Sequence, residues 1–304
     1  MILGAGGTGG ILGSALTKAG KDVTFIARGS NLDAMRNNGL IIRHLWDQTE
    51  EHLEVRALSM EESCALSLAP EVIFICVKEY SLDSVLPFIR QTAGPRTIII
   101  PILNIYGTGA RVQKELPDCT VLDGCIYVSA SLEHPGVLVQ HGPILRVVFG
   151  PRDPSYISPI LSAIQSDLCE SGIDGVLSTH IQRDALEKFS YVSPIGASGV
   201  YLHAVADFQK EGPARELFKS MIREISALAA AMGYPFEKDY VKINLEILSN
   251  LSADATTSMQ RDIMEGKPSE LDGLVMEPLR LAKKYSVSMP CYEEVAKVLC
   301  PLEF

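Results

Sequence analysis

Short apolar runs rich in β-branched residues recur along the first half of the chain. They read VTFIA, EVIFICVK and RTIIIPIL and begin at residues 23, 71 and 96. Runs of this length without a polar face are typical of strands that are buried on both sides in a parallel sheet. Helical or loop segments are expected between them, so the pattern predicts an α/β domain.

More closely spaced apolar runs follow, in CTVLDGCIYVSA, GVLVQHG and LRVVFG. Short spacing favours antiparallel pairing, because two antiparallel strands need only a tight turn between them. The turn-forming segment GPRDPS is expected to end this sheet. The segment PILSAIQSDLCESG is then expected to form the last helix of the domain.

The second half of the chain has a helical pattern. The segment PARELFKSMIREISALAAAMGYP places its apolar residues on one stripe and then meets the stop signals Gly233 and Pro235. The stripe consists of Leu217, Phe218, Met221, Ile222, Ile225, Leu228 and Met232. We therefore predict two domains, an α/β domain at 1–179 and an all-helical domain at 180–304.

A glycine cluster opens the chain in MILGAGGTGGILGSAL. Gly4, Gly6 and Gly9 have the spacing G-x-G-x-x-G between an apolar pair and a predicted helix. In a dinucleotide-binding turn the first glycine makes the turn, the second lets a pyrophosphate approach, and the third lets helix and strand pack closely. The phosphates then lie on the helix N-terminus. The first domain is therefore predicted to be a Rossmann-type domain whose loop, which also contains Gly7 and Thr8, binds the cofactor.

Two observations bear on this interpretation. A mobile glycine-rich turn, with Gly7 and Gly10 as additional glycines, could give the same spacing by chance. The first strand has only the two apolar residues Ile2 and Leu3, so a few residues are expected to precede the printed sequence.

The residue at the end of the second strand indicates the cofactor. An acidic residue there accepts a hydrogen bond from the 2′-hydroxyl group of NAD, whereas an arginine suits the 2′-phosphate of NADP. This chain has Arg28 at that position, followed by the donors Gly29, Ser30 and Asn31. NADPH is therefore the predicted cofactor. The alternative is an ordinary solvated arginine at a strand end.

Composition narrows the function classes. The 304 residues are enough for two domains, and 47% hydrophobic and 21% charged residues are typical of a soluble globular protein. A net charge of −10 argues against nucleic acid or an anionic membrane as a partner. The cysteines form no C-x-x-C pair and the histidines have no metal-ligand spacing, so we expect reduced thiols and no metal site. No segment resembles a membrane span or a targeting signal, which favours a cytoplasmic location.

Two polar residues follow predicted strands of the parallel sheet. Lys78 ends the run EVIFICVK, which we take as the third strand, and Asn104 follows the run RTIIIPIL. Open parallel sheets bind ligands beyond the carboxyl ends of their strands, where a lysine and an amide can meet a cofactor or an anionic substrate. A capping or solvated role for Lys78, and a turn-forming role for Asn104, are equally good interpretations of each residue alone.

The second domain adds a lysine, a serine and several acids. Lys188 lies in an otherwise apolar helical run, and partial burial would make it easier for its ammonium group to release a proton. A lysine on an ordinary amphipathic helix is the commoner outcome. Ser258 and Asp262 share a helical face, while Glu270 and Asp272 open a helix, where acids often serve only as caps.

Taken together and in order, these motifs resemble the ketopantoate reductase family (2-dehydropantoate 2-reductase). They are the glycine loop, VK at Lys78, Asn104, EKF around Lys188, SM at Ser258 and E-L-D from Glu270. The resemblance covers nearly the whole chain. It implies an enzyme that uses NADPH to reduce 2-dehydropantoate, a small 2-oxo acid, to (R)-pantoate in the pathway to pantothenate and coenzyme A.

The resemblance also implies a role for each matching residue. Lys188 would be the general acid, Glu270 would orient the hydroxyl group of the substrate, and Ser258 would hold its carboxylate. Lys78 and Asn104 would align the cofactor and the substrate. These roles suit the chemistry, because negative charge grows on the ketone oxygen during hydride transfer and an ammonium group can both stabilise that charge and supply the proton.

The chain departs from the family pattern at several positions. Some members have asparagines four and eight residues after the catalytic lysine, where this chain has Val192 and Gly196; Ser193 could replace them as a substrate ligand. The other departures are Ile105 after Asn104, and Val275 and Met276 after Glu270.

Two alternative functions stay open. Fewer amide donors could suit a reductase of the same architecture that acts on another 2-oxo acid. A non-catalytic NADPH-binding regulator is the other alternative, and the presence of Lys188 and Glu270 counts against it. The long apolar helices of the second half could also bury a homodimer interface.

Overall fold

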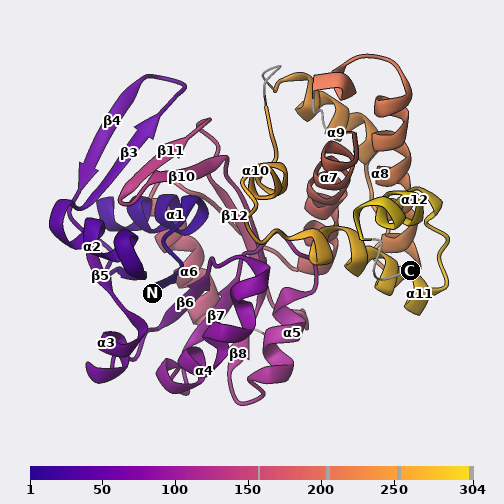
Figure 1. Ribbon diagram of the computed structural model, residues 1–304. Helices are drawn as coiled ribbons and strands as arrows, with labels where there is room; N and C mark the ends of the chain where they lie inside the picture. The colour runs from indigo at the N-terminus through magenta and orange to yellow at the C-terminus, as the bar shows by residue number, and fades with distance from the viewer. Residues whose placement is uncertain (157, 203–205, 252–254, 301–304) are drawn as a thin grey trace. The chain divides into compact units, whose positions relative to one another are not determined.

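The computed structural model describes residues 1–156, 158–202, 206–251 and 255–300. Its contacts divide the chain into two compact units (Figure 1). The first unit contains Met1–Leu103 and Gly107–Ile181, and the second contains Asn104–Tyr106 and the chain from Gln182 onward. Asn104 therefore belongs to the second unit although it follows a strand of the first. The predicted boundary between 179 and 180 stays a prediction.

A six-stranded parallel sheet forms the centre of the first unit. Its strands have the order β5-β2-β1-β6-β7-β8, and each neighbouring pair is parallel. This is the order of doubly wound dinucleotide-binding folds, in which the direction of winding reverses between two adjacent central strands, here β1 and β6. The predicted fold class is confirmed. The strands are β1 (Ile2–Leu3), β2 (Thr24–Ile26), β5 (Arg56–Leu58), β6 (Val72–Ile75), β7 (Ile98–Pro101) and β8 (Thr120–Val121).

Helices cover both faces of this sheet, because successive strand residues point to opposite sides. Ile2, Phe25 and Phe74 pack with helices on one face, whereas Leu3 and Ile73 belong to a separate cluster on the other. The first face carries α1 (Gly7–Lys18), α2 (Gly29–Asn38) and α6 (Pro159–Glu170), and the second carries α4 (Leu82–Thr92) and α5 (Thr108–Glu115). A short helix, α3 (Met60–Ala65), lies between β5 and β6, and the 3-10 turn η1 (Glu79–Ser81) leads into α4.

Three strands between residues 26 and 72 were not predicted. β3 (Leu40–His44) and β4 (Thr49–Leu53) form a hairpin, which Figure 1 shows in violet, and β5 returns to the parallel sheet. β4 reads TEEHL, with charged residues suited to an exposed edge strand and no apolar run to reveal it. The expectation of only helices and loops in this stretch was therefore wrong, and Lys78 follows the fourth strand of the parallel sheet in chain order.

The strands after residue 118 form parts of three sheets, so the prediction of antiparallel pairing was only partly right. β10 (Ala130–His134) pairs antiparallel with β11 (Val137–Gln140), but β11 pairs parallel with β3. β12 (Arg146–Gly150) pairs antiparallel with β9 (Asp123–Tyr127). The segment GPRDPS does not end this sheet, because the chain returns after α6 and adds β13 (Asp174–Leu177) parallel to β12.

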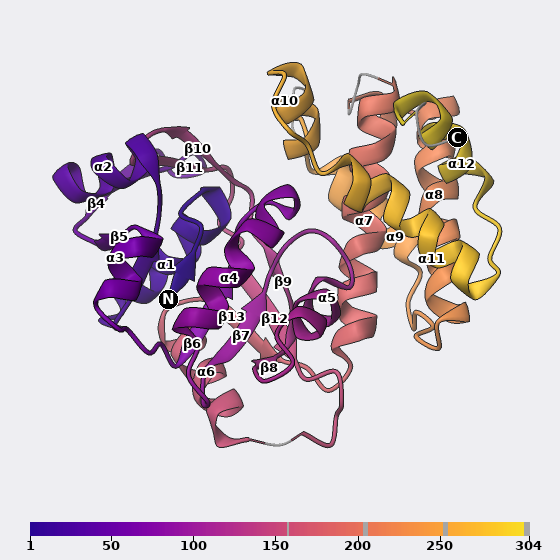
Figure 2. The same cartoon turned by 60° about the horizontal axis from the view of Figure 1, so that its bottom comes forward.

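The described part of the second unit is helical, as predicted. Figures 1 and 2 show α7 and α8 lying side by side, and α8 buries the predicted stripe, including Phe218 and Met221, before Gly233 adopts a positive φ of 90°. The elements are α7 (Ile181–Leu202), η2 (Ala206–Gln209), α8 (Pro213–Ala231), α9 (Tyr240–Ser249), α10 (Ser258–Met264), the π-helical turn η3 (Asp272–Met276), α11 (Glu277–Tyr285) and α12 (Pro290–Leu299).

A proline inside α7 leaves one carbonyl group without its helical donor. Pro194 has no N–H group, so the Ser190 carbonyl oxygen, four residues earlier, cannot receive the usual hydrogen bond. Asn244 from α9 replaces it: its Nδ2 donates to the Ser190 carbonyl oxygen at 3.0 Å and lies near Ser190 Oγ at 3.1 Å. Asn244 is 1% exposed. This contact supports the helix turn that carries Lys188.

Candidate functional site

The glycine loop has the geometry that its spacing predicts. Gly4 has a φ of 103° and packs against the backbone of Val77, and a Cβ on Gly9 would lie 2.1 Å from the Gly4 carbonyl oxygen. A Cβ on Gly6 would have no heavy atom within 4 Å. Gly6 is also the N-cap of α1, and no side chain caps this helix. The loop thus offers open space beside uncapped N–H groups, as a pyrophosphate requires.

The two additional glycines of the loop serve packing. A Cβ on Gly7 would lie 2.5 Å from the Ala130 carbonyl oxygen in β10, and one on Gly10 would lie 2.4 Å from Leu138 Cδ1 in β11. The first turn of α1 therefore lies close against the β10–β11 hairpin. The sequence carries no signal for this contact, because the hairpin is remote in the chain.

Arg28 lies at the position that the cofactor prediction requires. It follows β2 at its carboxyl end, is exposed and is the N-cap residue of α2. Its guanidinium group has no ion-pair partner among the residues that the structure describes. The neighbouring Asn31 has a different role from the one expected: its amide donates to the Ala5 carbonyl oxygen at 3.0 Å and accepts from the Gly136 N–H group at 2.8 Å. Asn31 thus links the glycine loop, at Ala5, to the turn at Gly136.

Lys78 lies at the edge of the sheet where the glycine loop lies. It follows β6, the neighbour of β1, and is the N-cap residue of η1. Gly4 packs against Cys76 and Val77, immediately before Lys78 in the chain. Lys78 is half-buried. Its predicted role in aligning the cofactor stays a prediction.

Lys188 and Asn104 are joined by a hydrogen bond within the second unit. Lys188 Nζ donates a hydrogen bond to Asn104 Oδ1 at 2.8 Å. Lys188 is 9% exposed, and its helix neighbours Leu186 and Phe189 are buried. An ammonium group in such a place has lost most of its water and depends on its hydrogen-bond partner for orientation. The two residues were predicted separately, and the structure brings them together.

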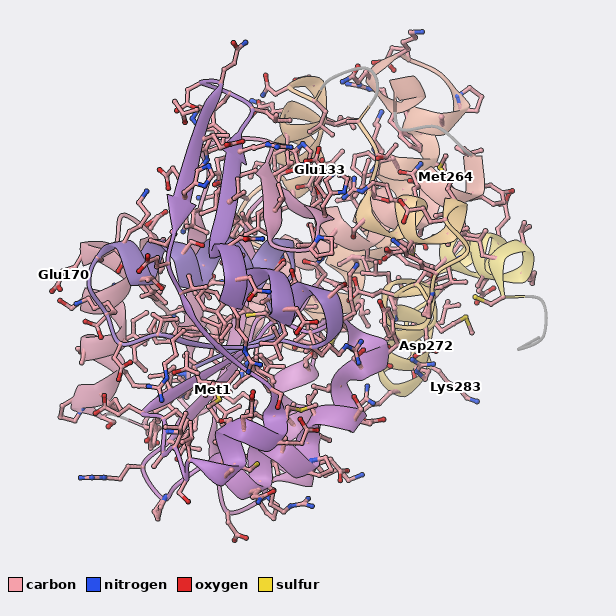
Figure 3. The ribbon with its side chains drawn as sticks, turned by 60° about the vertical axis from the view of Figure 1, so that its left-hand side comes forward. Met1, Glu133, Glu170, Met264, Asp272 and Lys283 are labelled. Atoms are coloured by element: carbon pink, nitrogen blue, oxygen red, sulfur yellow. The ribbon has the colours of Figure 1, made fainter. Side chains whose placement is uncertain are left out.

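Glu270 is a buried acid at the start of a helical segment. Its exposed fraction is 2%, and its carbonyl oxygen accepts a hydrogen bond from the Leu274 N–H group at 3.0 Å. Asp272, predicted to open the same helix, is exposed and forms a two-pronged ion pair with Arg280 at 2.8 and 2.7 Å. Figure 3 shows Asp272 at the outer edge of this segment, near Lys283. Of the two acids, only Glu270 is buried, so only Glu270 could contact a substrate that is shielded from water.

The two remaining candidate residues, Ser258 and Ser193, are held by different contacts. Ser258 is the first residue of α10 and is half-buried, and the helix is capped by Thr257 through a capping box with Gln260. Ser193 is fully buried, and its hydroxyl group donates to the Leu274 carbonyl oxygen at 2.6 Å and bonds with Tyr292 Oη. That hydroxyl group bonds to two helical segments of the second unit, and the predicted role of Ser193 as a substrate ligand stays a prediction.

The positions that lack the family asparagines are apolar. Gly196 is buried, and a Cβ there would lie 3.3 Å from Met259 Cε and 3.4 Å from Leu274 Cδ1. Val192 packs against the same apolar cluster. The helix face that follows Lys188 is therefore covered by hydrocarbon.

A second ionisable group lies next to Lys188 in the chain. Tyr240 from α9 donates a hydrogen bond to Glu187 Oε2 at 2.5 Å. Burial raises the pKa of Glu187, and burial together with this acceptor raises the pKa of Tyr240. Glu187 is thus tied to α9 by a neutral donor.

One cavity lies away from these residues. Its volume is about 350 Å³, and residues at the amino ends of β1, β2 and β6 line it, together with Lys21, Arg56 and Asp167. Ligands of doubly wound folds bind at the carboxyl ends of the strands, so this cavity is not the candidate site.

Within the described ranges, no helix combines the length and the apolar character that crossing a bilayer requires. The same ranges contain no group of three or more His, Cys, Asp or Glu side chains that could hold a metal ion.

Comparison with known families gives matches over both halves of the chain. The model described as "Ketopantoate reductase PanE/ApbA" matches residues 1–154, and "Ketopantoate reductase PanE/ApbA C terminal" matches residues 180–303. An uncharacterized oxidoreductase of Bacillus subtilis is 24% identical over 296 residues, covering 97% of this chain and 95% of its own. The 2-dehydropantoate 2-reductase of Mesorhizobium japonicum is 27% identical over 319 residues, covering 97% and 94%.

Solved structures share the fold at lower identity. The crystal structure of 2-dehydropantoate 2-reductase from Methylococcus capsulatus has a TM-score of 0.86 at 23% identity, covering 99% of this chain and 96% of its own. A D-mandelate dehydrogenase with NADH and anilino(oxo)acetate has a TM-score of 0.85 at 19% identity, covering 98% and 96%.

Proposed function

The chain belongs to the ketopantoate reductase family, and on this basis we propose that it reduces 2-dehydropantoate to (R)-pantoate with NADPH. The observation that carries the proposal is the Lys188–Asn104 hydrogen bond of 2.8 Å, in the same helical unit as the buried carboxyl group of Glu270. The product would enter the pathway to pantothenate and coenzyme A.

The cofactor would be held by residues of the first unit. The open side of Gly6 and the uncapped N-terminus of α1 fit a pyrophosphate, and Thr8 lies in the same turn. The exposed guanidinium group of Arg28 would pair with a 2′-phosphate, which favours NADPH over NADH. Lys78, after β6, would align the cofactor. When bound, the nicotinamide supplies a hydride to the carbon of the substrate ketone.

Lys188 would act as the general acid. As negative charge grows on the ketone oxygen, the ammonium group stabilises it and then donates its proton to that oxygen. The Asn104 amide oxygen holds Lys188 Nζ in place at 2.8 Å, so little reorganisation is needed when the charge develops. Asn104 therefore orients the acid in addition to its proposed contacts with cofactor and substrate.

Glu270 and Ser258 would select the substrate. The buried carboxyl group of Glu270 would accept a hydrogen bond from the terminal hydroxyl group of 2-dehydropantoate. The hydroxyl group of Ser258 would donate to the carboxylate of the substrate. A net charge of −10 makes such local donors necessary for binding an anion.

A different 2-oxo acid is the second candidate substrate, favoured by the apolar residues Val192 and Gly196 on the helix face after Lys188. Such a face suits a branched or aromatic side chain better than a polar one. The proposal also includes a cytoplasmic location, a small-molecule substrate with no nucleic acid partner, and a homodimer formed through the helical unit.

Oxidation of NADPH in the presence of a panel of 2-oxo acids tests the proposal. The panel contains 2-dehydropantoate, 2-oxoisovalerate and one aromatic 2-oxo acid, each also measured with NADH. We expect the highest kcat/KM for 2-dehydropantoate with NADPH. A preference for the aromatic compound would move the assignment to the second candidate substrate, and binding of NADPH without turnover of any 2-oxo acid would indicate a non-catalytic regulator.

A further inference from the structure

A second proline removes a helical hydrogen bond close to Glu270. Pro278 lies in the first turn of α11 and has no N–H group, so the Leu274 carbonyl oxygen, four residues earlier, cannot receive the bond that an α-helix would supply. The preceding turn, Asp272–Met276, is π-helical. Isolated π turns of this kind often lie at functional sites. Ser193 from α7 donates its hydroxyl proton to the Leu274 carbonyl oxygen at 2.6 Å.

Tyr292 completes a relay of hydrogen bonds to this turn. The proton of Ser193 Oγ is used on Leu274, so the Tyr292 hydroxyl group must be the donor in its bond with Ser193 Oγ. Tyr292 and Ser193 are both 0% exposed. Burial raises the pKa of Tyr292, which keeps its hydroxyl group a neutral donor.

Both ends of the relay are anchored. Tyr292 lies at the start of α12, where its N–H group and that of Cys291 donate to the carboxylate of Glu224 from α8 at 3.1 and 2.8 Å. The relay therefore starts from a capped helix end and finishes on the π turn.

The backbone of the π turn contacts Glu270 and the residue that follows Asn104. The Leu274 N–H group donates to the Glu270 carbonyl oxygen at 3.0 Å. A Cβ on Gly273 would lie 2.6 Å from Ile105 Cδ1, so the turn lies directly on the residue that follows Asn104. A shift of this turn would move Glu270 and would release Ile105.

We propose that Tyr292 and Ser193 are positioning residues for substrate recognition: their relay fixes the π turn Asp272–Met276 and, through it, the buried carboxyl group of Glu270. This inference rests on the proposed function, in which Glu270 accepts a hydrogen bond from the hydroxyl group of the substrate. A phenylalanine at position 292 would fill nearly the same space, so the hydroxyl group has a role that packing alone does not require.

The test compares Tyr292→Phe with Tyr201→Phe as its matched control. Tyr201 also joins α7 to α12, through a hydrogen bond to Glu294 at 3.0 Å, but this bond does not involve the π turn. Loss of one buried neutral hydrogen bond in Tyr292→Phe is expected to raise the KM for 2-dehydropantoate about three- to tenfold. The kcat/KM for 2-oxoisovalerate, which lacks the hydroxyl group, and the Kd for NADPH should stay within about twofold of the parent values. Tyr201→Phe should change none of them.

Hydrogen–deuterium exchange provides a readout that is independent of turnover. Exchange of the Gly273–Glu277 amides should accelerate in Tyr292→Phe and in a second variant, Ser193→Ala, and should be unchanged in Tyr201→Phe. Unchanged exchange overturns the inference, as does an equal loss of kcat/KM for both substrates. A parent protein that reduces no 2-oxo acid contradicts the proposed function instead, and the relay is then judged by exchange alone.

Discussion

Lys188 and Asn104 are joined by a hydrogen bond of 2.8 Å although they lie 84 positions apart in the chain. The contact links a short segment that follows β7 to the helical unit and gives a buried ammonium group a defined acceptor. A general acid needs this kind of fixed orientation more than it needs a particular position in the sequence.

The first prediction concerns this lysine. Lys188→Ala should lower kcat by about 10²–10⁴, the usual contribution of a general acid, while the Kd for NADPH changes little. Stopped-flow or steady-state turnover and cofactor fluorescence measure the two quantities. Lys242→Ala, on an exposed position of α9, is the control and should keep the parent kcat. Turnover of Lys188→Ala within a few-fold of the parent would remove Lys188 from the mechanism.

The second prediction concerns the choice of cofactor. A charged hydrogen bond contributes roughly 1.5–3 kcal/mol, so Arg28→Ala should raise the KM for NADPH at least about tenfold and leave that for NADH nearly unchanged. Arg56→Ala, at the start of β5, should leave both unchanged. Equal use of NADPH and NADH by the parent protein would be incompatible with the proposed role of Arg28.

The third prediction concerns substrate choice. Glu270→Ala should reduce kcat/KM for 2-dehydropantoate strongly and that for 2-oxoisovalerate only slightly, because only the first compound carries the hydroxyl group. Glu265→Ala is the matched control, since Glu265 is exposed, lies outside the π turn and pairs with Lys267. Comparable efficiency of the parent enzyme on both compounds would show that Glu270 does not read the hydroxyl group.

The fourth prediction separates cofactor binding from folding within one loop. Gly6→Ala meets no heavy atom within 4 Å, so it should unfold at the parent temperature yet bind NADPH more weakly. Gly9→Ala would place a methyl group 2.1 Å from the Gly4 carbonyl oxygen and should lower the free energy of unfolding by about 1–3 kcal/mol or more. Thermal unfolding and cofactor titration of both variants check this. Normal NADPH affinity in Gly6→Ala would argue against a phosphate at this turn.

The fifth prediction concerns the proline in α7. Asn244→Ala leaves the buried Ser190 carbonyl oxygen without its donor and should lower the free energy of unfolding by about 1–3 kcal/mol. Pro194→Ala restores an N–H group to that carbonyl oxygen, so adding it to Asn244→Ala should recover part of the loss. Urea unfolding of the two single variants and the double variant measures the coupling. Strictly additive effects would mean that the two side chains do not share the Ser190 carbonyl group.

The sequence predicted the elements that have a strong pattern of their own. Apolar runs identified β2, β6 and β7, and the stripe of Met221 and its neighbours identified α8. β4 was missed because TEEHL is a charged edge strand that buries almost nothing. The role of a residue was harder to predict where it depends on a distant partner. Asn31 and Ser193 are polar residues near the expected site, yet their hydrogen bonds go to Ala5, Gly136, Leu274 and Tyr292.

The segment Asn104–Tyr106 makes the helical unit discontinuous in sequence. A gene fusion that exchanged only the chain after residue 180 with that of a relative would bring in a new partner for Ile105, whose side chain lies where a Cβ on Gly273 would be. Relatives with a small residue after the asparagine would leave a hole there, and those with a side chain at position 273 would clash. Recombination within this family should therefore succeed more often when residues 104–106 are exchanged together with the C-terminal half.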